Sequence, residues 1–333
     1  AVDCGRYTCL VGGFDGRDAQ DRRDAQDRRD AQDRRDAQDR PTVVAMKARE
    51  LGRAGVVVGD RVALVGDTSG APGTLARVVR VEERRTLLRR SADDTDPVER
   101  VIVANADQMA IVTALADPEP RPRMVDRCLV AAYDAGLDPL LVLTKADLRD
   151  AGPFLSSYAP LDVPHVVTSR SGAGVQGLDA VRNRMRDRVT VLVGHSGVGK
   201  STLVNALVPG TARATGAVNE VTGRGRHVST SAVAVPLPGG GWVVDTPGVR
   251  SFGLAHVVPD RIVRHFPDLL RGTDECPRGC THDEEECGLD AFVRAGGAGA
   301  AGVARLESLR RLLRSRSGAG EDGSRPSDRS PSG

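Results

Sequence analysis

A glycine-rich loop that ends in lysine and serine is the segment of this sequence best suited to hold phosphate. It follows an apolar run at 189–193 and precedes a helical pattern at 200–207, the context that a phosphate-binding loop requires. Backbone N–H groups of such a loop cradle a β-phosphate. We expect Lys200 to contact the β- and γ-phosphate oxygens and Ser201 to bind Mg²⁺. The loop consists of Gly194, His195, Ser196, Gly197, Val198, Gly199, Lys200, Ser201 and Thr202.

A second segment suited to metal and phosphate is Asp-Thr-Pro-Gly at 245–248, directly after the apolar run 242–244. An aspartate at a strand end can hold Mg²⁺ through water, and the Gly248 N–H can contact a γ-phosphate. A simple Pro-Gly turn would look the same, but the phosphate loop upstream favours the chemical interpretation. We therefore assign Asp245 to magnesium and Gly248 to catalysis.

The tetrapeptide Thr144, Lys145, Ala146 and Asp147 follows the apolar run 140–143 and is suited to reading guanine. The Asp147 carboxylate can accept the N1–H and the 2-amino group of guanine, and adenine offers neither donor. A Lys-x-Asp turn is common by itself, but together with the two phosphate segments it favours GTP over ATP. Ser169 and Arg170, after the apolar run 163–167, are expected to supply a backbone N–H to the guanine O6.

The order of these segments is unusual, because the guanine tetrapeptide precedes the phosphate loop. Ordinary GTPases have the reverse order, so the sequence reads as circularly permuted, which a compact domain tolerates when its ends lie close together. We expect an α/β domain over residues 98–253, with buried parallel strands at 109–115, 140–144, 189–193 and 242–244 and helices at 123–135 and 200–207.

Hydrolysis is expected to be slow in the isolated protein. Many GTPases orient the attacking water with a glutamine directly after Asp-x-x-Gly, and Val249 stands at that position. His227, at the end of the glycine-rich segment 223–227, is the best candidate to replace the glutamine. An ordinary solvated loop histidine is the competing interpretation.

Three cysteines and a histidine lie within twelve residues, as Cys276, Cys280, His282 and Cys287. A Cys₃His set fills all four positions of tetrahedral Zn²⁺, which is typical of a structural site rather than a hydrolytic one. The alternative is a group of unligated thiols near an unrelated histidine. We expect one structural Zn²⁺ per chain.

The composition is that of an ordinary globular protein. The 333 residues are 40% hydrophobic and 28% charged, and the net charge is +2, so any nucleic-acid surface has to be a local patch. We see no secretory signal and no apolar run of membrane-spanning length, and we expect a cytoplasmic protein without a membrane partner.

The two ends of the chain differ in character. Residues 1–90 contain short β-like runs at 7–11, 42–46, 61–65 and 76–81, which favour a small barrel. The hexapeptide Arg-Asp-Ala-Gln-Asp-Arg repeats four times over 17–40, and we expect a disordered, solvated insertion, with an RNA-touching arm as the alternative. Residues 254–313 are expected to form a mainly helical zinc-binding domain with a last helix near 306–313, and 314–333 a disordered tail.

Together these motifs, in this order, make the chain similar to the ribosome small-subunit-dependent GTPase A family of bacteria. The resemblance covers nearly all of residues 1–313 outside the repeat. It implies a multidomain protein: an N-terminal OB-fold, a circularly permuted P-loop GTPase domain and a C-terminal zinc domain. It also implies late maturation of the 30S ribosomal subunit, contacts with 16S rRNA and GTP hydrolysis stimulated by the subunit. We expect a monomer that cycles between GTP and GDP.

Two of the nucleotide segments depart from the family's pattern. His227 is followed by Val228, Ser229 and Thr230 where His-Thr-Thr-Thr is usual, so the switch ligand of Mg²⁺ is Ser229 or Thr230, and we assign Thr230. Arg170 stands where alanine is usual. Two other functions remain open, a GTP-gated RNA-binding scaffold without catalysis and a permuted GTPase of large-subunit assembly. The barrel and the zinc site argue against the second.

Overall fold

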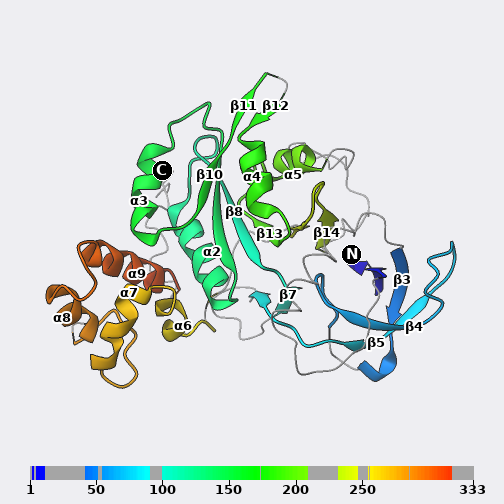
Figure 1. Ribbon diagram of the computed structural model, residues 1–333, viewed down its shortest axis with the longest axis horizontal. Helices are drawn as coiled ribbons and strands as arrows, with labels where there is room; N and C mark the ends of the chain where they lie inside the picture. Colours follow the sequence, from blue (N-terminus) through cyan, green and yellow to red (C-terminus); the bar gives the residue numbers. More distant parts are fainter. Residues whose placement is uncertain are drawn as a thin grey trace, which may run out of the picture.

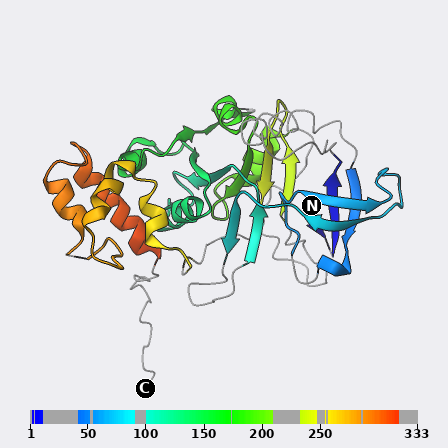
Figure 2. The ribbon, with the colours of Figure 1, turned by 60° about the horizontal axis from the view of Figure 1, so that its bottom comes forward.

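The protein consists of an N-terminal β-sheet, a central α/β region and a C-terminal helical region that follow one another across the molecule (Figure 1, Figure 2). The computed structural model describes residues 2–3, 5–11, 42–51, 55–90, 100–172, 174–208, 232–246, 254, 256–284 and 286–316. The repeat at 17–40, the tail beyond residue 316 and the predicted site residues His227, Thr230 and Gly248 lie outside these ranges.

The central sheet places the carboxyl ends of its parallel strands at one edge. Its strand order is β10-β9-β8-β13-β15-β14, and only the pairing of β14 with β15 is antiparallel. All seven residues of the central strand β8 are buried. The strands are β8 (Gln108–Ala114), β9 (Asp138–Thr144), β10 (His165–Val167), β13 (Val189–Val193), β14 (Val233–Pro236) and β15 (Trp242–Asp245). The predicted parallel strands are confirmed.

Helices cover both faces of this sheet, and the side chains of β8 alternate between two cores. Met109 and Ile111 belong to the core that includes α2, whereas Ala110 and Val112 belong to the core that includes α5. This alternation is why the strand reads as a continuous apolar run. The helices of the region are α2 (Pro122–Asp134), α3 (Gly152–Tyr158), η3 (Ala159–Leu161), α4 (Leu178–Met185) and α5 (Lys200–Leu207), and a small hairpin is formed by β11 (Ser169–Ser171) and β12 (Gly174–Gln176).

The N-terminal strands form one sheet with a small core of its own. The order is β1-β2-β3-β5-β4, antiparallel except between β3 and β5. Side chains alternate along β3, so that Val43 and Ala45 are buried and their neighbours are exposed. The elements are β1 (Val2–Asp3), β2 (Arg6–Leu10), β3 (Thr42–Lys47), η2 (Arg49–Leu51), β4 (Val62–Gly66) and β5 (Ala76–Val81). All four predicted N-terminal strands are therefore present.

A two-stranded sheet joins this region to the central one. β6 (Leu87–Arg90) pairs with β7 (Arg100–Ala104). The predicted N-terminal region ends at residue 90 and the predicted α/β domain begins at residue 98, so one strand of this pair falls in each. Gly59 packs against the backbone of β7 with φ +90°, where a Cβ would lie 1.9 Å from the Ala104 carbonyl oxygen. Only glycine fits this close approach.

The C-terminal helices share a hydrophobic core with the central α/β region. Phe266, the N-cap of the second C-terminal helix, and Leu309 of the last helix belong to the same buried cluster as Leu129 of α2. The elements are α6 (Pro259–Val263), α7 (Pro267–Leu270), η4 (Arg271–Glu275), α8 (Gly288–Arg294) and α9 (Gly302–Arg316). In the described part of the chain, none of the helices combines the length and apolar character needed to span a bilayer.

Candidate functional site

The phosphate loop connects β13 to α5 in a conformation that needs its glycines. Gly194, Gly197 and Gly199 have φ values of +151°, +80° and +94°. A Cβ on Gly194 would lie 2.3 Å from the Val112 carbonyl oxygen, so the loop runs directly over the end of β8. Gly199 is the N-cap of α5, and the helix N-terminus therefore opens toward the loop.

The lysine of the loop points back into it. The Lys200 ammonium donates to the carbonyl oxygens of Gly194 at 2.5 Å and His195 at 2.7 Å. Ser201 and Thr202 follow in the first turn of α5, and both are exposed. An ammonium inside the loop and a hydroxyl at the helix start are the groups that phosphate oxygens and Mg²⁺ require.

The guanine tetrapeptide leaves the end of β9 and meets the segment that was expected to support it. The Asp147 carboxylate accepts the backbone N–H of Arg170 at 2.9 Å, and this hydrogen bond lowers the pKa of Asp147. The Ala146 N–H donates to the Thr168 carbonyl at 3.1 Å. Asp147 precedes α3 in the chain and the strand Ser169–Ser171 follows it, and the fold brings the two together.

One contact links the guanine tetrapeptide directly to the phosphate loop. The buried Thr144 hydroxyl donates to the Val198 carbonyl oxygen at 2.7 Å. Lys145, with φ +60°, donates from its ammonium to the Asp117 carbonyl oxygen, and the next residue, Pro118, lies beside Gly197. Sequence reasoning assigned Thr144 to the guanine side alone, because spacing along the chain does not reveal that β9 ends beside the loop.

Asp245 lies at the same edge of the sheet as the phosphate loop. It ends β15 opposite Leu192 of β13, and the Thr246 hydroxyl after it donates to the Leu192 carbonyl at 3.1 Å. A carboxylate here and the Ser201 hydroxyl supply the oxygen ligands that Mg²⁺ prefers. The other predicted members of this site, His227, Thr230 and Gly248, are outside the described residues.

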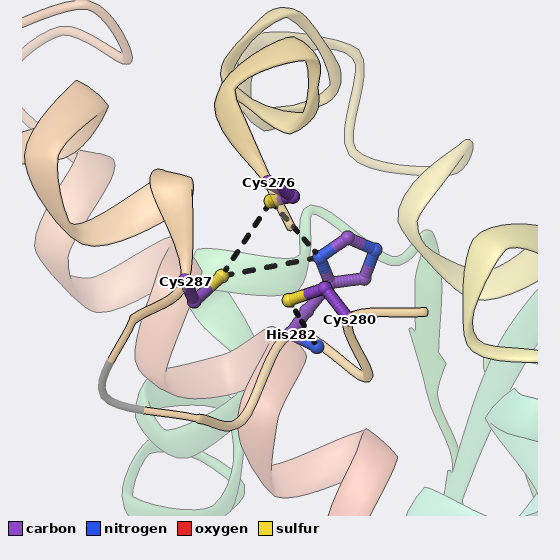
Figure 3. A group of neighbouring side chains, drawn as sticks. All are labelled: Cys276, Cys280, His282 and Cys287. Carbon is purple, nitrogen blue, oxygen red and sulfur yellow. Dashed lines mark hydrogen bonds between the residues drawn. The ribbon is translucent and has the colours of Figure 1, made fainter. Parts of the chain in front are cut away.

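The four predicted zinc ligands converge from η4, the following loop and the start of α8 (Figure 3). One ligand atom from each of Cys276, Cys280, His282 and Cys287 lies within 4.8 Å of all the others. The Cys276 and Cys287 sulfurs are 3.8 Å apart, and the His282 Nδ1 is 3.6 Å from the first and 3.9 Å from the second. Two thiolates on one tetrahedral Zn²⁺ at ~2.3 Å lie about 3.8 Å apart. The donor set therefore fits zinc in both chemistry and size.

Burial keeps the thiols of this cluster protonated while no metal is bound, and a neighbouring ion pair holds the backbone of its histidine. Desolvation is the main cause that raises the pKa of Cys276, of Cys287 and, to about 11, of Cys280. A bound dication is what would make these thiols ionise. The Arg310 guanidinium donates to the His282 carbonyl at 3.0 Å and forms two hydrogen bonds with the Asp290 carboxylate, which lower the pKa of Asp290. Arg310 thereby connects the cluster to α8 and α9, a contact that the sequence pattern did not indicate.

Comparisons with known proteins agree with this geometry. The profile of the RsgA GTPase family matches residues 81–255. The small ribosomal subunit biogenesis GTPase RsgA of Chlorobaculum tepidum is 39% identical over 250 residues, which cover 72% of this chain and 80% of the relative. The protein of the same name from Ectopseudomonas mendocina is 40% identical over 223 residues, covering 64% of this chain and 63% of the relative.

Solved structures show the same fold. YjeQ from Thermotoga maritima matches with a TM-score of 0.60 and 26% identity, covering 83% of this chain and 91% of YjeQ. YloQ, described as a circularly permuted GTPase, matches with a TM-score of 0.58 and 21% identity over 84% of this chain and 88% of YloQ, which supports the fold alone. With the nucleotide motifs in permuted order and a family match over more than half its length, this chain belongs to the RsgA family of GTPases.

Proposed function

We propose that the chain hydrolyses GTP as a late maturation factor of the small ribosomal subunit, which it contacts through 16S rRNA and which stimulates its turnover. The observation that carries the proposal is the contact between Thr144 and Val198. It places the segment that we assign to guanine beside the loop that we assign to phosphate, and the two stand in permuted order in the chain. The relatives that match this chain at 39% and 40% identity are named small ribosomal subunit biogenesis GTPases.

The nucleotide contacts follow from chemistry and position. Asp147 accepts the two guanine donors, and the Ser169–Arg170 backbone faces O6. The loop from Gly194 to Thr202 surrounds the phosphates, with Lys200 on the β- and γ-oxygens. Ser201, Asp245 and a switch hydroxyl, Thr230 in our assignment, would hold Mg²⁺, which when bound neutralises charge on the phosphates. We assign the Gly248 N–H to the γ-phosphate.

Slow turnover by the isolated protein follows from Val249, whose side chain cannot hydrogen-bond to a water. We propose that the small subunit orders the segment 223–230 and that His227 then orients the attacking water. A group that acts only in the activated complex raises kcat without changing nucleotide affinity.

The remaining parts support this activity. Zn²⁺ on Cys276, Cys280, His282 and Cys287 is structural, because all four positions are filled by protein. We propose that the five N-terminal strands form an OB-type barrel; their single core and mostly antiparallel order favour it. The OB-type region covers 1–90, the GTPase domain 98–253 and the zinc domain 254–313. We further propose a monomeric, cytoplasmic protein.

Turnover with and without 30S subunits tests the proposal. We expect slow hydrolysis alone and a clear acceleration by 30S but not by 50S subunits. His227→Ala should lose most of the acceleration with unchanged GTP affinity, whereas the matched change at exposed His165 should keep it. Acceleration by 50S subunits would favour the large-subunit alternative. GTP-dependent 30S binding without any turnover would favour the scaffold.

A further inference from the structure

The two ring nitrogens of His282 face different groups. Nδ1 points toward the sulfurs of Cys276 and Cys287, at 3.6 Å and 3.9 Å (Figure 3). Nε2, on the far side of the ring, lies 3.7 Å from the Asp260 carboxylate. The His282 side chain is 5% exposed, so a water shell does not surround the ring.

Asp260 comes from a different part of the chain than the cluster. It lies in α6, whose residues Ile262 and Val263 are buried in the core shared with α2. The next residue, Arg261, forms an ion pair of 2.9 Å with Asp134 at the end of α2. The carboxylate is therefore presented by a helix that is anchored on the GTPase region.

We propose that Asp260 is the outer carboxylate of the zinc site, which keeps His282 oriented with Nδ1 toward the metal and Nε2–H toward Asp260. The inference rests on the zinc assignment proposed above. A carboxylate that accepts the second N–H of a ligating histidine selects its tautomer, orients its ring and raises its basicity. The zinc site thus includes a residue of α6, sixteen positions upstream of its first cysteine.

Water is the alternative to Asp260 as acceptor of the His282 Nε2–H, because the two residues line an open cavity. Asp260, Arg264, Thr273, Cys276, Cys280 and His282 line one open cavity of about 320 Å³. The Asp260 side chain is 70% exposed, so water in this cavity competes with the carboxylate for Nε2–H. Loss of the Asp260 carboxylate should therefore weaken zinc affinity by a factor near the lower end of the roughly 10- to 100-fold range for such outer carboxylates.

The first measurement is zinc affinity of the full chain by competition with a chromogenic chelator. Asp260→Asn should weaken zinc binding by about 10-fold, and Asp260→Glu should recover part of the loss. Asp274→Asn is the matched control, because it removes one exposed carboxylate from η4 and should leave affinity unchanged. Circular dichroism and GTP affinity, both expected to stay as in the wild type, verify folding.

The second measurement is ¹⁵N NMR of the histidine ring with zinc bound. In the wild type we expect Nδ1 as the metal-bound nitrogen and a slowly exchanging Nε2–H. In Asp260→Asn this proton should exchange faster. Equal zinc affinities for Asp260→Asn and Asp274→Asn, or a metal-bound Nε2, would overturn the inference. A wild-type chain that takes up no zinc would instead overturn the zinc assignment itself.

Discussion

Asp147 is prepared by its neighbours to act as a fixed hydrogen-bond acceptor. The backbone N–H of Arg170 lowers the pKa of Asp147, so the carboxylate stays ionised to a lower pH than an ordinary aspartate does. We predict that Asp147→Asn shifts the preference from GTP toward XTP, because an amide donor suits the xanthine carbonyl. Equilibrium binding of both nucleotides checks this, with exposed Asp162→Asn as the control. Unchanged GTP affinity would remove Asp147 from the guanine site.

The Thr144 hydroxyl joins the two segments that we assign to guanine and to phosphate. Thr144→Val keeps the shape of the side chain but leaves the Val198 carbonyl without its donor, at a cost of about 1–3 kcal/mol. We predict that GTP and GDP affinities both fall roughly 5- to 150-fold, because the phosphate loop loses a fixed point. Thr144→Ser should bind nearly as the wild type does. A Val variant with wild-type affinity would show that the contact does not shape the site.

The candidate site was partly predictable from sequence because its main pieces are local. A strand, a glycine loop and a helix follow one another from Val189 to Leu207, and the chemistry is readable from that order alone. The contacts of Thr144 and Asp260 were not predictable. Each joins segments that meet only after the sheet and the helices have packed, and neither leaves a periodic signal.

At the scale of elements, a buried carboxylate meets a partly exposed arginine where α9 packs on α2. The Arg311 guanidinium lies 3.2 Å from the Asp126 carboxylate and 4.8 Å above the Tyr158 ring. Burial raises the pKa of Asp126 even though Arg311 opposes the shift. Since folding raises this pKa, ionising Asp126 costs stability, and the cost is absent at low pH and grows as pH rises through the folded value.

We predict that Arg311→Met destabilises the protein by about 2 kcal/mol at pH 7, because it leaves Asp126 buried without a counterion. The value is below that of a fully buried pair, since Arg311 is 35% exposed. The loss should shrink toward pH 4, where Asp126 takes up a proton. Urea unfolding at both pH values measures it. The double variant Asp126→Leu/Arg311→Met should recover most of the stability, and a loss independent of pH would contradict this account.

The regular elements were more predictable when they were long. The runs that became β8, β9 and β13 are continuously apolar because both faces of the sheet are covered. β14 was missed, since it lies in a stretch rich in proline and glycine and pairs through a turn of three glycines at positive φ. α6 and α7, of five and four residues, are too short for helical periodicity to separate them from loop.

At the scale of the whole molecule, the central sheet and the C-terminal helices share one core, so we expect zinc binding to stabilise both against unfolding. Trp242, the one tryptophan of the chain, lies in β15 and reports on the central sheet. We predict that removing zinc with a chelator lowers the unfolding temperature, measured by Trp242 emission, by several degrees. Without the metal, the loop that carries the four zinc ligands would no longer hold α6 to α9 together.

A second reporter provides the control. In a Trp242→Phe chain carrying Tyr7→Trp, the emission follows the N-terminal sheet, whose core is separate. That transition should shift less when zinc is removed. Equal shifts would mean that the molecule unfolds as one unit, and no shift at Trp242 would mean that the zinc region is independent of the GTPase sheet.

The position of β8 in the middle of its sheet also determines when the sheet can be completed during synthesis of the chain. β9 follows β8 after a single helix, but its other neighbour, β13, begins about eighty residues later in the chain. During synthesis β8 therefore has one bare hydrogen-bonding edge until residue 193 has left the exit tunnel, and such edges invite mispairing. We expect the segment assigned to guanine to fold first, the phosphate loop next and Asp245, assigned to magnesium, last. A nascent chain arrested before Asp245 should consequently be unable to retain GTP.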